Sequence, residues 1–149
     1  MESPLGSKSS SFADRILDMS DYLLGSTSVP QQFSNPVRQN TELLKCSNTE
    51  VLRYSKVPYS VEVCVKQCAR SGTSIGANVA EGQGVQSKAD LVAKLSIAYK
   101  EAKETEYWLE RLRNRKVLTE DMFTSMNNDL QEILRLLISS LNTLKNRKD

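Results

Sequence analysis

The alternation of apolar and polar residues predicts four helices along the chain. The clearest pattern lies in residues 87–114, where apolar or small residues recur at alternating spacings of four and three: Leu91, Leu95, Ala98, Ala102, Thr105, Leu109 and Leu112. This period keeps one helix face against its neighbours. Ser87 and Asp90 have the spacing of a capping box, which predicts the start of this helix.

The other three helices are predicted from their apolar stripes and from residues that favour helix ends. The first covers residues 12–24, after a capping box that begins at Ser11, with Gly25 as a natural stop. The second begins near Pro58 and ends near Gly82 or Gly84, since a proline suits a first helical turn. The last follows Thr119, and its apolar face comprises Phe123, Met126, Leu130, Ile133, Leu137, Leu141 and Leu144. No strand-like alternation of useful length occurs, so we predict an all-α, antiparallel up-down four-helix bundle.

The chain of 149 residues is long enough for one domain with a real core. We interpret residues 1–11 as a flexible N-terminal leader and residues 12–149 as a single four-helix-bundle domain. A polar loop is inserted at 25–57, where Asn-Thr-Glu-Leu-Leu-Lys-Cys-Ser is followed at once by Asn-Thr-Glu-Val-Leu-Arg-Tyr-Ser. A local duplication that lengthened a surface loop and an arm that docks on a neighbour both fit this repeat.

Residues 70–82 contain three glycines, which should weaken a helix. Yet Gly72, Gly76 and Ala80 recur one turn apart, and such a stripe lets another helix backbone approach closely. A phosphate-binding loop is the alternative, but the Gly-Lys-Ser/Thr ending and a preceding strand are missing. Trp108 lies outside the apolar stripe of its helix, and an exposed tryptophan often anchors an interface. Together these features predict a homo-oligomer.

The polar residues of the same motif share one helix face. Ser74, Asn78 and Glu81 follow one another at spacings of four and three. We favour a structural role, in which they satisfy backbone groups or link helices, over ligand binding. Antiparallel pairing of the second and third helices also predicts an ion pair between Arg70 and Glu101 that fixes their register.

The residue types present argue against an enzyme. The chain has no histidine, so the commonest general base and the usual catalytic triads are absent. Cys64 and Cys68 lie one helical turn apart and Cys46 is remote, which suits neither a disulfide nor a four-ligand zinc site. We therefore expect reduced thiols, no metal and no cofactor. The absence of a signal-peptide pattern and of a long apolar run leads us to expect a cytoplasmic protein.

Three segments of the second and third predicted helices carry a family resemblance. They are residues 70–82 (Arg-Ser-Gly-Thr-Ser-Ile-Gly-Ala-Asn-Val-Ala-Glu-Gly), residues 87–90 (Ser-Lys-Ala-Asp) and residues 100–109 (Lys-Glu-Ala-Lys-Glu-Thr-Glu-Tyr-Trp-Leu). They resemble the four-helix-bundle proteins encoded in intervening sequences of bacterial large-subunit rRNA genes. That family is similar to the accessory variability proteins of diversity-generating retroelements, which bind nucleic acid and a reverse transcriptase. The resemblance implies a bundle fold and rings of five subunits, although the insertion at 25–57 departs from the family's short link.

Basic residues cluster near the ends of the third and fourth predicted helices. The candidate nucleic-acid-binding residues are Lys56, Lys66, Arg111, Arg113, Arg115, Lys116, Lys145, Arg147 and Lys148. Cations at helix C-termini also complement the helix dipole, so a structural role is the simpler alternative. In a ring of five, about twenty basic groups would line one rim and bind phosphates together. Few aromatic residues interleave them, so we expect shape-tolerant binding.

The sequence thus predicts a non-enzymatic, homo-oligomeric protein that presents a basic rim to RNA or DNA. The alternative is an interaction adaptor or scaffold, for example an accessory subunit of a reverse transcriptase, with little direct nucleic-acid affinity. The expected partners are further copies of the chain, a nucleic-acid backbone and a nucleic-acid enzyme, and no membrane. Net charge is only +2, so any basic recognition must be local.

Overall fold

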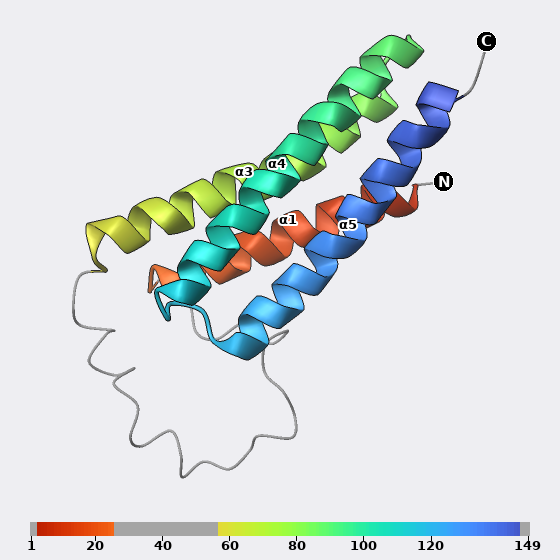
Figure 1. The fold of residues 1–149 in the computed structure, drawn as a ribbon. Helices are drawn as coiled ribbons and strands as arrows, with labels where there is room; N and C mark the ends of the chain where they lie inside the picture. The colour runs from red at the N-terminus through yellow and green to blue at the C-terminus, as the bar shows by residue number, and fades with distance from the viewer. Residues whose placement is uncertain (1–2, 26–56, 147–149) are drawn as a thin grey trace.

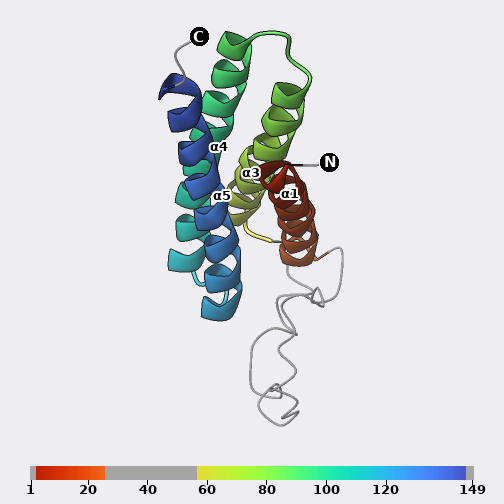
Figure 2. The ribbon, with the colours of Figure 1, turned by 90° about the vertical axis from the view of Figure 1, so that its right-hand side faces the viewer.

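The computed structural model describes residues 3–25 and 57–146, which form four helices and no strand. The helices are α1 (Pro4–Leu23), α3 (Tyr59–Gln83), α4 (Lys88–Asn114) and α5 (Glu120–Asn146). Each helix packs against two others, in the cyclic order α1, α3, α4, α5 (Figure 1, Figure 2). The α3–α4 contact is the most extensive and the α1–α5 contact the least. The described residues therefore form an all-α bundle, as predicted.

The core forms where the predicted apolar stripes face one another. Its largest fully buried side chains come from all four helices: Phe12, Ile16, Met19, Val65, Ile75, Leu109, Leu112, Met126, Leu130, Ile133 and Leu137. On α4 every member of the predicted stripe from Leu95 to Leu112 is buried, and only Leu91, in the first turn of the helix, is half-buried. The Ser87 hydroxyl caps α4 by accepting a hydrogen bond from the Asp90 backbone N–H at 3.1 Å. The predicted stripe and start of this helix are thus confirmed.

The start of α1 differs from the prediction. The helix begins at Pro4, and the Ser3 hydroxyl caps it by accepting a hydrogen bond from the Gly6 backbone N–H at 3.1 Å. The predicted cap at Ser11 lies inside the helix, and residues 4–11 are helical rather than part of a flexible leader. The physical reason is that apolar contact continues toward the N-terminus, because Leu5 is buried in the core.

Some predicted features lie outside the described residues. The tandem repeat at 40–55, Cys46, Lys56, Arg147 and Lys148 all fall there. The chain leaves α1 and enters α3 at the same end of the bundle, which is also where α4 ends (Figure 1). In the described ranges, no helix combines the length and apolar character needed to cross a bilayer.

Candidate nucleic-acid interface and the helix motif beside it

The glycine stripe of α3 brings α1 into close contact. A Cβ atom added at Gly72 would lie 2.9 Å from Cγ1 of Ile16, and one added at Gly76 would lie 3.2 Å from the Ser9 carbonyl oxygen. The predicted close approach is therefore present, but the neighbour is a helix of the same chain. Ala80, the third member of the stripe, is exposed. The contacts of Gly72 and Gly76 thus belong to the subunit core and do not by themselves indicate a second copy.

The ion pairs between α3 and α4 fix a register one turn away from the prediction. The Arg70 guanidinium lies 2.6 Å from Oε1 of Glu104, not beside Glu101 as predicted. Glu81 pairs with Lys94 in the same register. The buried contact between Ser71 and Thr105, at 2.9 Å, holds the two helices in this register and places Glu104 rather than Glu101 near Arg70.

A buried pair of hydroxyl groups lies between the same two helices. Thr105 Oγ1 lies 2.9 Å from Ser71 Oγ, and both side chains are fully buried. Each hydroxyl also lies within hydrogen-bond distance of a carbonyl of its own helix, so neither is unsatisfied. The sequence pattern places Thr105 in the apolar stripe of its helix and assigns no role to Ser71.

The polar motif residues bond mainly to their own helix. The Ser74 hydroxyl donates to the Arg70 carbonyl at 2.8 Å, and the Asn78 amide donates to the Ser74 carbonyl at 2.9 Å. Such bonds support the structural interpretation over ligand binding. Glu101 differs, because its Oε2 atom is buried and accepts no hydrogen bond among the described residues.

Trp108 is held within its own subunit. Its indole N–H donates to Glu104 Oε1 at 3.2 Å, and its ring packs half-buried against the core. The ring of Tyr107 meets it edge to face, with the ring centroids 5.0 Å apart. Trp108 is therefore less available as an interface anchor than its place in the sequence suggests, whereas Tyr107 remains half-exposed.

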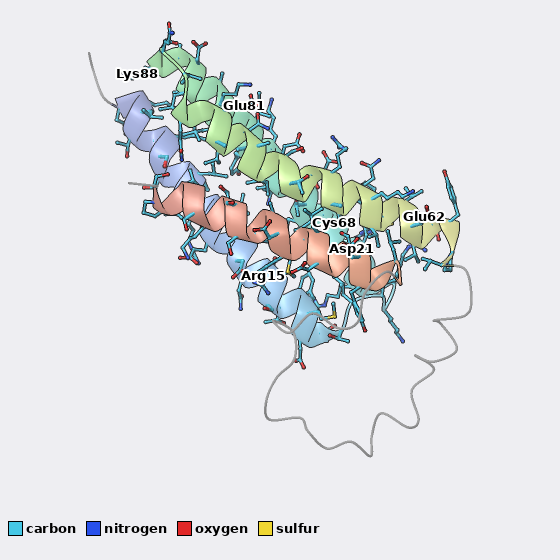
Figure 3. All side chains as sticks on the ribbon, turned by 180° about the vertical axis from the view of Figure 1, so that it is seen from behind. Arg15, Asp21, Glu62, Cys68, Glu81 and Lys88 are labelled. Carbon is cyan, nitrogen blue, oxygen red and sulfur yellow. The ribbon has the colours of Figure 1, made fainter. Side chains whose placement is uncertain are left out.

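The predicted basic residues separate to opposite ends of the bundle. The start of α3 meets the end of α4, where Arg115 donates a hydrogen bond to the Ser60 hydroxyl at 3.1 Å. This end includes Lys66, the two arginines of α4 (Arg111 and Arg113) and Arg115 at its C-cap, whereas Lys145 lies in the last turn of α5 at the other end (Figure 1). Glu62 and Lys88 mark these two ends in Figure 3. The structure thus brings together one cluster and leaves the other apart.

Two of the clustered cations are already neutralised. Lys66 pairs with Glu62 at 2.7 Å, and Arg113 pairs with Glu120 at 2.7 Å. Hydrogen bonding to these carboxylates raises the pKa of both cations. The same bond lowers the pKa of Glu120. These pairs contribute little net charge to the surface.

Three cations at this end have no acidic partner among the described residues: Arg111, Arg115 and Lys116. The Arg111 guanidinium lies over the Tyr107 ring, 5.2 Å from its centroid. Lys116 has a φ of 58° and closes α4, with its N–H donating to the Arg113 carbonyl at 2.8 Å. This turn could not be predicted from the residue at position 116, since glycine is the usual residue at a positive φ.

Exposed tyrosines accompany these cations, contrary to the expectation that aromatic residues are sparse. The side chain of Tyr59 is 80% exposed at the start of α3, next to the serine that binds Arg115. Tyr107 is 50% exposed and precedes Arg111 by one helical turn. The spacing of Tyr107 and Arg111 was a readable signal, whereas Tyr59 could be placed only once α3 was seen beside the end of α4.

The described residues bring no three metal-ligating side chains together. Cys64 and Cys68 are buried and unbridged, as predicted, and Cys68 lies midway along α3 (Figure 3). Burial, with a smaller contribution from Cys64, raises the pKa of the Cys68 thiol to about 12. The thiol is therefore unreactive at neutral pH.

Comparisons with known proteins agree with this architecture. The family model described as 23S rRNA-intervening sequence protein matches residues 46–139. The chain is also similar to the crystal structure of a protein of unknown function from the S23 ribosomal protein family of Bacteroides thetaiotaomicron. Identity is 37%, the match covers 92% of this chain and 97% of that one, and the TM-score is 0.65. Among curated proteins, none matches the chain.

Proposed function

Because the chain belongs to the 23S rRNA-intervening sequence protein family, we propose that it is a non-enzymatic, nucleic-acid-associated bundle protein of the cytoplasm. It would present the end of the bundle where α3 begins and α4 ends to the phosphates of RNA or DNA. The observation that carries this proposal is the group of three cations without acidic partners, Arg111, Arg115 and Lys116. Charges that are not already neutralised are the ones that can bind phosphate and release counterions.

Assembly would multiply the effect of so small a cluster. We propose that the bundle is antiparallel. The residue nearer the start of α3, Arg70, pairs with Glu104, which lies further along α4. The residue nearer the end of α3, Glu81, pairs with Lys94, which lies closer to the start of α4. A cyclic homo-oligomer of such bundles, a pentamer by the family resemblance, would gather about fifteen unpaired cations on one rim. A single copy, with three, would bind phosphate weakly.

Binding can be measured by fluorescence anisotropy of labelled RNA and DNA over a series of salt concentrations, with native mass spectrometry of the same samples. Affinity should fall steeply with salt. A variant with Arg111→Gln, Arg115→Gln and Lys116→Gly should lower the slope of log K against log salt by about three if one copy contacts the nucleic acid. Glycine is chosen at 116 because it suits the positive φ.

A matched control removes three cations elsewhere, with Lys88→Gln, Arg135→Gln and Lys145→Gln. This control should retain the affinity and the salt slope of the wild type. An equal loss of affinity in both variants would show that binding depends on overall charge. Unchanged affinity in the first variant would show that the end where α3 begins and α4 ends is not the binding surface. A wild type that binds no oligonucleotide at low salt would refute nucleic-acid association altogether.

A second candidate function is an adaptor for a nucleic-acid enzyme, such as a reverse transcriptase, with little nucleic-acid affinity of its own. The neutralised state of Lys66, Arg70 and Arg113 favours it, since those cations are held by carboxylates of the same chain. The salt series separates the two candidates, because an adaptor would stay assembled while retaining no oligonucleotide.

A further inference from the structure

The end of the bundle that carries the unpaired cations also carries aromatic surface. Tyr59 is 80% exposed and Tyr107 50%, and both lie on elements that the Arg115–Ser60 hydrogen bond holds together at 3.1 Å. Elsewhere in the described chain the large exposed hydrophobic side chains are aliphatic: Leu17, Ile97 and Ile138. The two exposed tyrosines therefore coincide with the cations rather than being scattered over the surface.

The Tyr107 ring is held in position from two sides. The Arg111 guanidinium lies 5.2 Å from its centroid, and the Trp108 ring meets it at an interplanar angle of 77°. Trp108 is itself fixed by its hydrogen bond to Glu104, which also binds Arg70. A planar ring and a planar guanidinium that are already ordered lose little rotamer entropy when a further planar group is added.

We propose that this aromatic–basic end, defined by Tyr59, Tyr107, Arg111, Arg115 and Lys116, binds single-stranded nucleic acid in preference to duplex. The inference rests on the nucleic-acid association proposed above and specifies its ligand. Unpaired bases can stack on the tyrosine rings and on the Arg111 guanidinium, while the cations contact the backbone phosphates. In a duplex the base faces are covered by their neighbours, so the tyrosines would gain nothing.

Stacking of this kind distinguishes single strands from duplexes more than it distinguishes one base sequence from another, because every base has an aromatic face. We therefore expect similar affinities for uridine-rich and adenine-rich strands of equal length. The proposal assigns no protein group to the 2′-hydroxyl of RNA, so single strands of RNA and of DNA are tested separately.

The test uses the full chain with labelled single strands of RNA and of DNA, and a hairpin duplex of matched charge, at one moderate salt concentration. The double variant Tyr59→Leu/Tyr107→Leu removes the rings and keeps apolar bulk. It should weaken single-strand binding at least about tenfold, since stacking contributes roughly 1–3 kcal/mol per base. Duplex binding should change by less than about twofold. The variant Tyr59→Phe/Tyr107→Phe keeps the rings and should bind as the wild type does.

Tyr99→Leu provides a control on α4, since that tyrosine lies two turns before Tyr107 and is half-buried against the core. Circular dichroism melting shows whether each variant is folded, and substitutions at exposed tyrosines should leave the melting temperature nearly unchanged. Unchanged single-strand affinity in the double leucine variant would overturn the stacking proposal, and so would an equal loss on the duplex. With either result, the proposal that the cations bind phosphates is retained if the variant that replaces Arg111, Arg115 and Lys116 still loses binding. Failure of the wild type to bind any strand would instead refute the parent proposal.

Discussion

The contact between α3 and α4 and the contact between α1 and α5 close the same ring of helices by different means. Between α3 and α4, a hydroxyl pair at 2.9 Å is fully buried and ion pairs flank it. Between α1 and α5, Lys8 and Glu132 pair at 2.7 Å with side chains that are 44% and 45% exposed. Buried polar contacts leave a large penalty when broken, whereas exposed pairs contribute little.

The difference shows where the bundle is specified. The register of α3 on α4 is favoured by the buried contact between the Ser71 and Thr105 hydroxyls, which a shift of one helix along the other would break. The position of α1 depends on α3 rather than on α5, since α1 meets α3 at two glycines and has its smaller contact with α5. Changes on α3 should therefore matter more than changes at the α1–α5 contact.

The largest effect is expected for Gly72→Leu. Even a Cβ atom there would lie 2.9 Å from Cγ1 and 3.0 Å from Cγ2 of Ile16, both near the base of a fully buried side chain. Overpacking should lower the free energy of unfolding by about 3 kcal/mol, measured by urea denaturation. Ala80→Leu is the control, because Ala80 is exposed on the same helix and the change should cost under about 0.5 kcal/mol. Equal stability of the two variants would contradict the close contact.

A smaller effect is expected for Thr105→Val, which removes the buried hydroxyl and keeps the shape. The loss should be about 1–2 kcal/mol by chemical denaturation. Adding Ser71→Ala should cost less in this background than in the wild type, because the two hydroxyls are partners. Thr143→Val is the control, since its hydroxyl bonds the Ser139 carbonyl at 2.9 Å on an exposed face. A comparable loss at Thr143 would mean that burial does not matter.

At the α1–α5 contact, Arg15→Met and Lys8→Met should separate a partly buried cation from an exposed one. The Arg15 side chain is 15% exposed, binds Ser125 at 2.8 Å and pairs with Asp129. Its replacement should cost about 1 kcal/mol, and that of Lys8 less than about 0.5 kcal/mol. Thermal denaturation of both variants measures the difference. Should Lys8→Met prove the more damaging, the ranking of these contacts would be wrong.

The smallest effect concerns acid sensitivity at the α4–α5 contact. The hydrogen bond that Lys103 donates to Glu106 lowers the pKa of that carboxyl below its usual 4.5. The Gln131 side-chain amide, which donates to Glu106 Oε1 at 2.5 Å, lowers this pKa by a smaller amount. A lowered folded-state pKa stabilises the fold above the unfolded-state value, and this contribution is lost as pH falls through the folded-state value. Urea denaturation at about pH 7 and about pH 3 should therefore show a smaller acid loss in Glu106→Gln than in the wild type.

The control for this measurement is Glu110→Gln, which removes a nearby exposed carboxylate that accepts no hydrogen bond among the described residues. It should leave most of the acid loss in place. An acid loss as large in Glu106→Gln as in the wild type would show that the Lys103–Glu106 pair is not linked to folding.

The helices and the core could be predicted from the sequence because apolar spacing reports directly on burial. The stripe from Leu95 to Leu112 lies fully inside, and Ser87 caps its helix as expected. The start of α1 also had a signal, because Ser3 and Pro4 are a typical helix start and Leu5 extends the stripe of Phe12. The prediction instead began the helix after Ser11, whose capping box directly precedes the apolar stripe.

The candidate interface could be predicted only in part, because it depends on how helix ends meet. Arg111 and Arg115 follow one another along the same helix, so their clustering was visible in the sequence. Which cations are neutralised was not, since Glu120 lies across a turn from Arg113. The pairing of Arg70 with Glu104 could not be predicted either, because Glu101 and Glu104 lie one turn apart on α4 and the helix pattern alone does not choose between them.

The tight fit of Ile16 against Gly72 also limits how this protein can diverge. With no spare volume between the two positions, bulk at one must be matched by its absence at the other. A homologue that carries alanine or serine at 72 should therefore carry valine or alanine at 16, and the pair should covary across evolution as a unit of constant size.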